Sequence, residues 1–164
     1  MVSKQKNSLD QWEVGEHVPA LLTWVSNKTS ATGSHIYKHY FQLGIVDWRV
    51  MAYLGVFGTG TNGQICDFIG LDKGAVSRSI TNLLDSGHIV MRTIDGRTAE
   101  VKLTSKGVRT ANKMLVMAEK IEQELLFGIP EEECAAFKTT LKKMLENLPR
   151  LRSLLQSEGV KVFV

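Results

Sequence analysis

The fold is decided by residues 61–107, which read TNGQICDFIGLDKGAVSRSITNLLDSGHIVMRTIDGRTAEVKLTSKG. Thr61 and Gln64 are three residues apart at the start of this stretch, the spacing of a capping box, in which each side chain satisfies a backbone N–H of the other residue. Gly70 can adopt the left-handed conformation that ends a helix and turns the chain toward the next one. Residues 61–72 therefore predict a short helix followed by a tight turn.

A second helix is predicted from Lys73 to Ser86. Asp72 is a favourable N-cap for it, and Gly87 is a favourable residue just beyond its C-terminus. The apolar residues of this helix recur at helical spacing and share one face: Val76, Ile80, Leu83 and Leu84. We expect this face to pack on the core of the domain.

The opposite face of the second helix is small, polar and basic. A helix that enters the major groove of DNA needs small residues for close approach and a few long donors, because arginine can bind O6 and N7 of guanine. The residues of this helix that we expect to contact DNA are Lys73, Gly74, Ala75, Ser77, Arg78, Thr81 and Asn82. Only the N-terminal half of such a helix is expected to reach base edges.

Two antiparallel strands are predicted after the second helix, because apolar residues now recur at every second position. These residues are Ile89, Met91, Ala99, Val101 and Leu103. Asp95 and Gly96 between the strands favour a type I′ turn, which places Arg97 at the tip of a hairpin. Arg97 and Thr98 are the hairpin residues that we expect to contact DNA. An arginine on a thin hairpin fits a narrow minor groove, where the negative potential is strongest. Thr104 is expected to cap the next helix.

Helix, turn, helix, hairpin and helix, in this order, predict a winged helix-turn-helix, which is a DNA-binding module. A single arginine is more often a solvated surface charge, so the interpretation depends on order and spacing. Charge supports it: residues 73–109 contain seven basic and three acidic residues, a net charge of +4, whereas the whole chain carries only +3. The basic excess is concentrated on the module that would face phosphates.

At these positions the sequence resembles the MarR (multiple antibiotic resistance regulator) family of winged-helix transcription factors, and the resemblance covers nearly the whole chain. Its most specific parts are residues 76–78, 83–84, 86–88, 95–97 and 103–107. The resemblance implies a homodimeric repressor or activator of an inverted-repeat operator. It also implies that Ser77 and Arg78 contact DNA from the recognition helix, and Arg97 from the wing.

The predicted fold class is mainly α with a small β-hairpin. We expect an N-terminal helical dimerisation segment over residues 1–45, a winged helix-turn-helix lobe over residues 46–107, and C-terminal dimerisation helices over residues 108–164. In the first segment a helix is predicted from Pro19 to Phe41, although residues 32–34 interrupt its apolar pattern and favour a kink or a break. Asp47 is expected to cap a helix to about Phe57, and residues 58–60 to form a loop.

After the module a long helix is predicted from Thr104, with a break at residues 128–130 and a last helix beginning at the acidic residues 131–133. Pro149 is expected to bend the last helix. This helix carries more apolar surface at helical spacing than a monomer needs: Phe137, Leu141, Met144, Leu145, Leu148, Leu151 and Leu155. The excess predicts a homodimer, which would hold two recognition helices one DNA turn, roughly 34 Å, apart.

The partners expected are double-stranded DNA, a second copy of the chain and a small effector. The resemblance suggests an aromatic or anionic effector bound between the dimer helices and the DNA lobe. The aromatic and titratable residues near that place are Trp24, His35, His39, Tyr40 and Trp48, although each is also explained as a core or surface residue. Cys66 and Cys134 are expected to be buried thiols. A regulator that senses oxidants through one of these thiols is the alternative function.

Several classes are disfavoured by the sequence. The four histidines and two cysteines show no metal-binding spacing, and neither a nucleophile elbow nor a phosphate-binding glycine loop is present, so we expect no enzyme, cofactor or metal. The sequence shows no signal peptide or membrane span, which predicts a cytoplasmic protein. A winged helix used only for protein contacts is a further alternative, but it would not need both Arg78 and Arg97.

Overall fold

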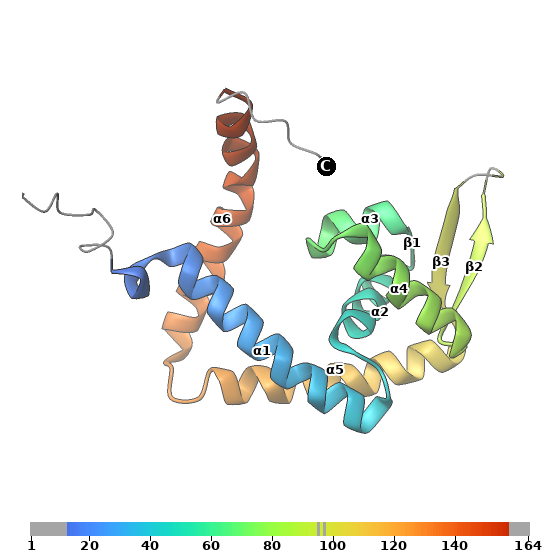
Figure 1. Ribbon diagram of the computed structural model, residues 1–164. Coiled ribbons are helices and arrows are strands. Elements are labelled where there is room, and N and C mark those ends of the chain that lie inside the picture. Colours follow the sequence, from blue (N-terminus) through green and yellow to red (C-terminus); the bar gives the residue numbers. More distant parts are fainter. Residues whose placement is uncertain (1–12, 95, 97, 158–164) are drawn as a thin grey trace, which may run out of the picture. The chain divides into compact units, whose positions relative to one another are not determined.

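The computed structural model describes residues 13–94, 96 and 98–157, without the side chains of residues 152, 155 and 156. Most of the described chain is helical, with one small antiparallel sheet, which confirms the predicted fold class (Figure 1). The chain forms two compact units, residues 1–119 and residues 120–164. None of the described helices is both long enough and apolar enough to cross a membrane.

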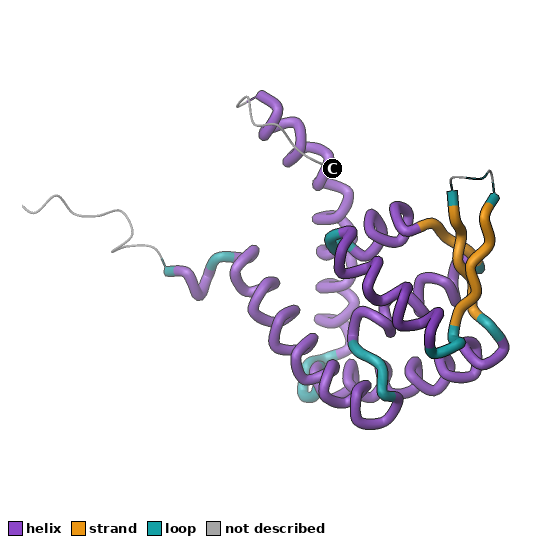
Figure 2. Tube along the Cα trace, turned by 45° about the vertical axis from the view of Figure 1, so that its right-hand side comes forward, coloured by secondary structure: helices purple, strands orange, loops and turns teal. Residues whose placement is uncertain are grey.

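The first unit holds the helix-turn-helix and the sheet (Figure 2). Its elements in chain order are η2 (Val14–Glu16), α1 (Val18–Phe41), α2 (Ile45–Phe57), β1 (Thr59–Thr61), α3 (Asn62–Ile69), α4 (Lys73–Asp85), β2 (Ile89–Thr93), β3 (Ala99–Leu103) and most of α5 (Ser105–Leu125). The sheet has the order β1-β3-β2, with both pairs antiparallel. In register, Val101 of β3 lies between Gly60 of β1 and Met91 of β2.

The core of this unit forms where α2, α3 and α4 pack against the sheet and α5. Its buried apolar side chains include Val50, Met51, Leu54, Ile65, Val76, Leu83, Ile89, Val101 and Met114. Burying a side chain of this size stabilises the fold by about 1.5–3 kcal/mol. The apolar stripe predicted for the second helix is therefore confirmed at Val76, Ile80 and Leu83, while Leu84 is only half-buried.

Strand β1 was not predicted, because Gly58 and Gly60 were interpreted as a loop. The strand has only three residues, too few for an alternating pattern to show in the sequence. Gly60 is required here, because a Cβ atom at this position would lie 2.5 Å from Cε1 of Tyr53. The glycine lets the strand cross the tyrosine ring closely enough to pair with β3.

Helix α1 is continuous from Val18 to Phe41, so residues 32–34 do not break it, whereas a kink there stays a prediction. Gly33 is buried within the helix. A glycine inside a helix costs about 1 kcal/mol relative to alanine, which tertiary packing can offset. The interruption in the apolar pattern therefore marks a close packing position and not a helix end.

Helix α2 begins at Ile45 with Gly44 as its N-cap, so the prediction that Asp47 is the N-cap is wrong. Asp47 is the third residue of the helix, and its Oδ2 accepts a hydrogen bond of 2.8 Å from the Gly44 backbone N–H. A carboxylate at this position reaches back to the cap residue, as in a capping box. The acid was correctly associated with the helix start, but it is the third residue of the helix and not the N-cap. The helix therefore begins three residues earlier than predicted.

The second unit consists of the end of α5 and helix α6 (Glu131–Ser157). The helices are separated by a turn in which Gly128 has a φ of 79°, and α6 begins with the predicted acidic residues 131–133. An ion pair of 2.8 Å joins Lys138 Nζ to Glu122 Oε1. Both side chains are more than half exposed, so solvent screens the pair and it contributes little to stability. Pro149 lies inside α6, and the bend expected there stays a prediction.

Candidate nucleic-acid interface

The helix-turn-helix is built as the sequence predicts. The Thr61 N–H donates to Gln64 Oε1 at 2.9 Å, and the Gln64 N–H donates to Thr61 Oγ1 at 3.3 Å, which completes the capping box of α3. Gly70 ends α3 with a φ of 67°, and Asp72 Oδ1 accepts from the Ala75 N–H at 2.9 Å to cap α4. Local hydrogen bonds therefore fix the turn between α3 and α4.

Helix α4 ends at Asp85, one residue before the predicted end, and presents an exposed polar face. Lys73, Gly74, Ser77, Arg78 and Thr81 are exposed, and Ala75 is half-buried. The Thr81 hydroxyl donates back to the Ser77 carbonyl oxygen at 3.1 Å, as threonines in helices often do. The structure thus brings these predicted contacts together on the outer side of α4.

Asn82 differs from the other predicted contacts. Although the residue is exposed overall, its Nδ2 donates to Asp47 Oδ2 at 2.9 Å and so points to α2. The neighbouring Ser79 is 5% exposed and donates its hydroxyl to Asp47 Oδ1 at 2.7 Å. Sequence reasoning missed this cluster because Asp47 is separated from both partners by more than thirty residues.

A shallow pocket of about 260 Å³ lies between the start of α2 and the N-terminal half of α4. Its lining residues are Val46, Asp47, Ala75, Arg78 and Ser79. Arg78 therefore stands beside a hollow in which the recognition helix meets α2. None of the five residues predicted to bind an effector lines this pocket.

The wing is the hairpin of β2 and β3. The Ile94 N–H donates to the Thr98 carbonyl oxygen at 2.9 Å, which leaves residues 95–97 between the bonded pair. The type I′ turn predicted at Asp95 and Gly96 involves a residue outside the described part of the chain, so it stays a prediction. Thr98 is half-buried, while Asp95 and Arg97 lie outside the described residues.

The C-terminal end of α4 is tied to α5 by a polar cluster. Thr104 Oγ1 donates to the Gly87 carbonyl oxygen at 2.9 Å and accepts from the Gly107 N–H at 3.0 Å, which confirms its capping role. Lys106 Nζ donates to the Ser86 carbonyl oxygen at 2.6 Å, and Ser86 Oγ lies 2.8 Å from His88 Nδ1. These bonds fix the end of the recognition helix against the start of the wing and α5.

His88 gives this cluster a predicted pH dependence. Burial, and next the positive charge of Lys106, lower the pKa of His88 below its ordinary value of 6.5, although Asp47 acts in the opposite direction. Below pH 6.5 the unfolded chain therefore takes up a proton that the folded chain resists, and stability falls as the pH falls. Replacing His88 with glutamine should reduce the loss of stability between pH 7.5 and 5.5, measured by urea unfolding.

The matched control for this prediction is His39→Gln, because His39 is exposed on α1. This variant should keep the wild-type dependence on pH. An unchanged dependence in the His88→Gln variant would contradict the role given to His88.

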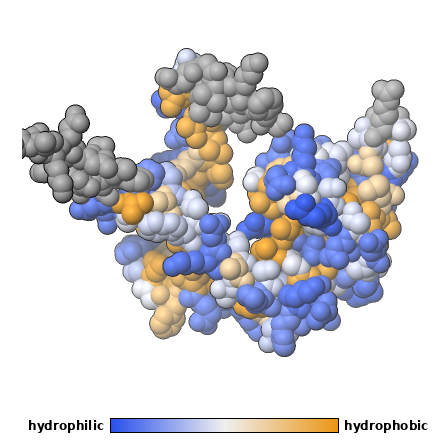
Figure 3. All heavy atoms as spheres, in the orientation of Figure 1, coloured by the Kyte–Doolittle hydropathy of each residue, from blue (hydrophilic) through white to orange (hydrophobic). Residues whose placement is uncertain are grey.

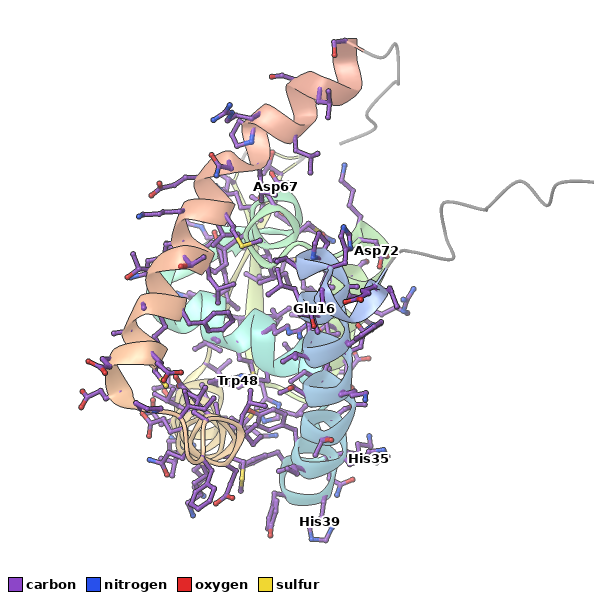
Figure 4. All side chains as sticks on the ribbon, turned by 90° about the vertical axis from the view of Figure 1, so that its left-hand side faces the viewer. Glu16, His35, His39, Trp48, Asp67 and Asp72 are labelled. Carbon is purple, nitrogen blue, oxygen red and sulfur yellow. The ribbon has the colours of Figure 1, made fainter. Side chains whose placement is uncertain are left out.

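The residues predicted to bind an effector lie on α1 and α2, and several of them take part in aromatic contacts. Trp48 packs against Tyr37, with ring centroids 5.9 Å apart, and His39 contacts Tyr40 edge to face at 4.8 Å. Figure 4 shows His35 on the side of α1 opposite to Trp48. Trp24 is 42% exposed and Tyr40 is 64% exposed. An effector site at these residues stays a prediction.

The two cysteines differ in exposure. Cys66 is buried, as expected, and its thiol donates to Asn62 Oδ1 at 3.0 Å. Burial, and next the negative charge of Asp67, raise the pKa of the Cys66 thiol. The reactive thiolate is therefore disfavoured. Cys134 is half-exposed near the start of α6, so the prediction that it is buried is wrong for the chain by itself.

Solved structures similar to this chain are transcriptional regulators, whereas no family model matches the sequence. A MarR/EmrR family transcriptional regulator from Acinetobacter sp. ADP1 is 27% identical, with a TM-score of 0.77 over 85% of this chain and 99% of that one. A cysteine-to-serine mutant of MarR from E. coli, complexed with operator DNA, is 21% identical, with a TM-score of 0.69 over 82% and 99% of the two chains.

An organohalide-sensing transcriptional regulator in its 2,4-dichlorophenol-bound form is 17% identical, with a TM-score of 0.71 over 90% of this chain and 88% of that one. At 17% and 21% identity, the likeness to the organohalide sensor and to the E. coli protein shows the fold alone. The fold and the exposed face of α4 define a winged helix-turn-helix protein. The solved structures similar to this chain are MarR-family transcriptional regulators and not enzymes, which agrees with the resemblance found in the sequence.

Proposed function

We propose that the protein is a homodimeric transcriptional regulator that binds an inverted-repeat operator, with α4 in the major groove and the wing in the minor groove. The observation that carries this proposal is the exposed face of α4, where small residues surround Arg78 and Lys73. The capped turn and the polar cluster at residues 86–107 hold this face rigidly. The similar MarR from E. coli, solved with operator DNA, supports the same use of the fold.

The dimer is supported by apolar side chains that the chain by itself leaves exposed. In α6, Phe137, Leu148 and Leu151 are 52%, 45% and 54% exposed, and with Leu141 and Met144 they follow the alternating spacing of four and three residues typical of helix pairing. Orange spheres along α6 in Figure 3 show part of this surface. Val18, Leu21, Trp24 and Val25 of α1 are also exposed. We therefore assign dimerisation to residues 1–45 and 108–164, and DNA binding to residues 46–107.

We further propose that a small aromatic or anionic effector shifts the DNA affinity, with Trp24, His35, His39, Tyr40 and Trp48 as the candidate contacts. The similar organohalide sensor with bound 2,4-dichlorophenol supports this class of ligand. An effector changes DNA binding only by its differential affinity for two states of the dimer. Because the operator is chromosomal DNA, the proposed location is the cytoplasm.

The proposal is tested by selecting bound sequences from random duplex DNA. A screen of small aromatic acids then looks for compounds that release the selected DNA. An inverted repeat should emerge, and its affinity should fall steeply with salt. Recovery of no symmetric sequence would reject the operator proposal.

Replacing Arg97 with alanine should weaken operator binding and reduce its dependence on salt. Each phosphate contact contributes about 0.9 to the slope of log affinity against log salt, so the dimer should lose about 1.8. Fluorescence anisotropy at several salt concentrations measures this slope. Folding should be intact, because Arg97 is expected at the exposed tip of the wing.

Lys142→Ala is the matched control, because it removes a positive charge from the exposed surface of α6. Its affinity and slope should equal those of the wild type. If Arg97→Ala behaves like this control, the wing does not contact the DNA.

A further inference from the structure

Asp47 is a buried acceptor that joins α2 to the recognition helix. Its side chain is 7% exposed and accepts three hydrogen bonds, from the Gly44 N–H, the Ser79 hydroxyl and the Asn82 amide, at 2.8, 2.7 and 2.9 Å. The first bond fixes the carboxylate to its own helix. The other two reach positions of α4 that are three residues apart and therefore lie on one side of that helix.

We propose that Asp47 is a positioning residue that fixes the rotation of α4 about its axis, and that Asn82 acts through Asp47 and not as a DNA contact. Apolar packing of Val76, Ile80 and Leu83 holds α4 on the core but is not directional. Hydrogen bonds are directional, and both oxygens of one fixed carboxylate are used. A rotation of α4 would break both bonds and turn Arg78 relative to the groove.

This inference rests on the proposed DNA binding and adds that the base specificity of the recognition helix depends on Asp47. Ser79 separates positioning from direct contact, because at 5% exposure it cannot reach DNA. Any change of base preference on removing its hydroxyl must therefore act through the position of α4. Arg49 offers a comparison on the same helix α2, because its Nη2 donates to Ser30 Oγ of α1 at 2.8 Å.

The experiment compares Ser79→Ala with Ser30→Ala in the full-length protein. Each variant loses one hydroxyl that bonds to α2, but only Ser79 belongs to the recognition helix. Affinity for the selected operator and for unrelated duplex DNA is measured over a range of salt concentrations, and thermal unfolding is followed by circular dichroism. Ser79→Ala should lower the ratio of specific to non-specific affinity by roughly threefold to tenfold, with the salt slope unchanged. Ser30→Ala should leave the ratio unchanged.

Asn82→Ala and Asp47→Asn complete the test. Both should alter base preference at the same operator positions as Ser79→Ala, and Asn82→Ala should have little further effect when combined with Asp47→Asn. Asp47→Asn keeps the size of the side chain, so it serves as the readout if Ser79→Ala does not fold. The inference is overturned if Ser79→Ala matches Ser30→Ala, or if Asn82→Ala relaxes one base position that the other variants leave intact. Failure of the wild type to bind any operator would instead reject the proposed function.

Discussion

Replacing Leu148 with glutamate should convert the protein to monomers and weaken operator binding by about 100-fold or more. Leu148 is 45% exposed and lies midway along the apolar stripe of α6. In a dimer a glutamate there would bury an unpaired charge, which costs far more than an apolar contact returns. Without the partner, each lobe binds a half-site alone, and the affinity gained by linking two sites, typically 100-fold to 10,000-fold, is lost.

Size-exclusion chromatography with light scattering, together with operator titration, measures both effects. Thr139→Glu is the control, because Thr139 is exposed on the side of α6 opposite to Leu148. It should remain a dimer with wild-type affinity. A Leu148→Glu protein that remains dimeric and binds normally would show that the stripe on α6 is not the dimer interface.

Replacing Gly107 with alanine should lower stability by about 2–3 kcal/mol and the unfolding midpoint by roughly 5–10 °C. Gly107 lies in the first turn of α5, where a Cβ atom would collide with the backbone carbonyl oxygen of His88 and lie 3.1 Å from Leu103 Cδ2. That carbonyl cannot easily move, because it accepts a hydrogen bond of 2.9 Å from the Thr104 N–H. The methyl group would therefore force α5 away from the end of α4.

Thermal unfolding followed by circular dichroism measures this effect. Gly55→Ala is the control, because Gly55 is exposed in α2 and an added Cβ atom meets nothing within 4 Å. Alanine there should raise stability by about 0.5–1 kcal/mol, since glycine is the weaker helix former. Equal stability of Gly107→Ala and the wild type would mean that the close approach of α5 to His88 is relaxed in solution.

The local signals in the sequence predicted the helix-turn-helix well. Caps at Thr61 and Asp72 and the left-handed glycine at Gly70 depend on residues within one turn of each other, so their spacing in the sequence is their spacing in space. The apolar stripe of α4 follows in the same way from helical periodicity.

Features that depend on distant residues could not be predicted in this way. The hydrogen bond from Asn82 to Asp47 could not be predicted, because a helical wheel shows only the direction of a side chain and not an acceptor on another helix. Strand β1 exists only because β3 offers it a partner, and Gly33 was interpreted as a break because its packing partners are not visible in the local pattern. The cluster around His88 likewise joins residues 86–88 to 104–107 across the whole wing.

The most direct test of the account is titration of the wild-type protein against its selected operator and against the same operator with about five base pairs inserted between the half-sites. This insertion turns one half-site to the opposite face of the duplex, because a helical turn is about 10.5 base pairs. The account predicts an affinity reduced by about 100-fold, toward that of a single half-site, and a shallower dependence on salt. Binding that is indifferent to the insertion, or insensitive to salt on every symmetric duplex, would contradict it.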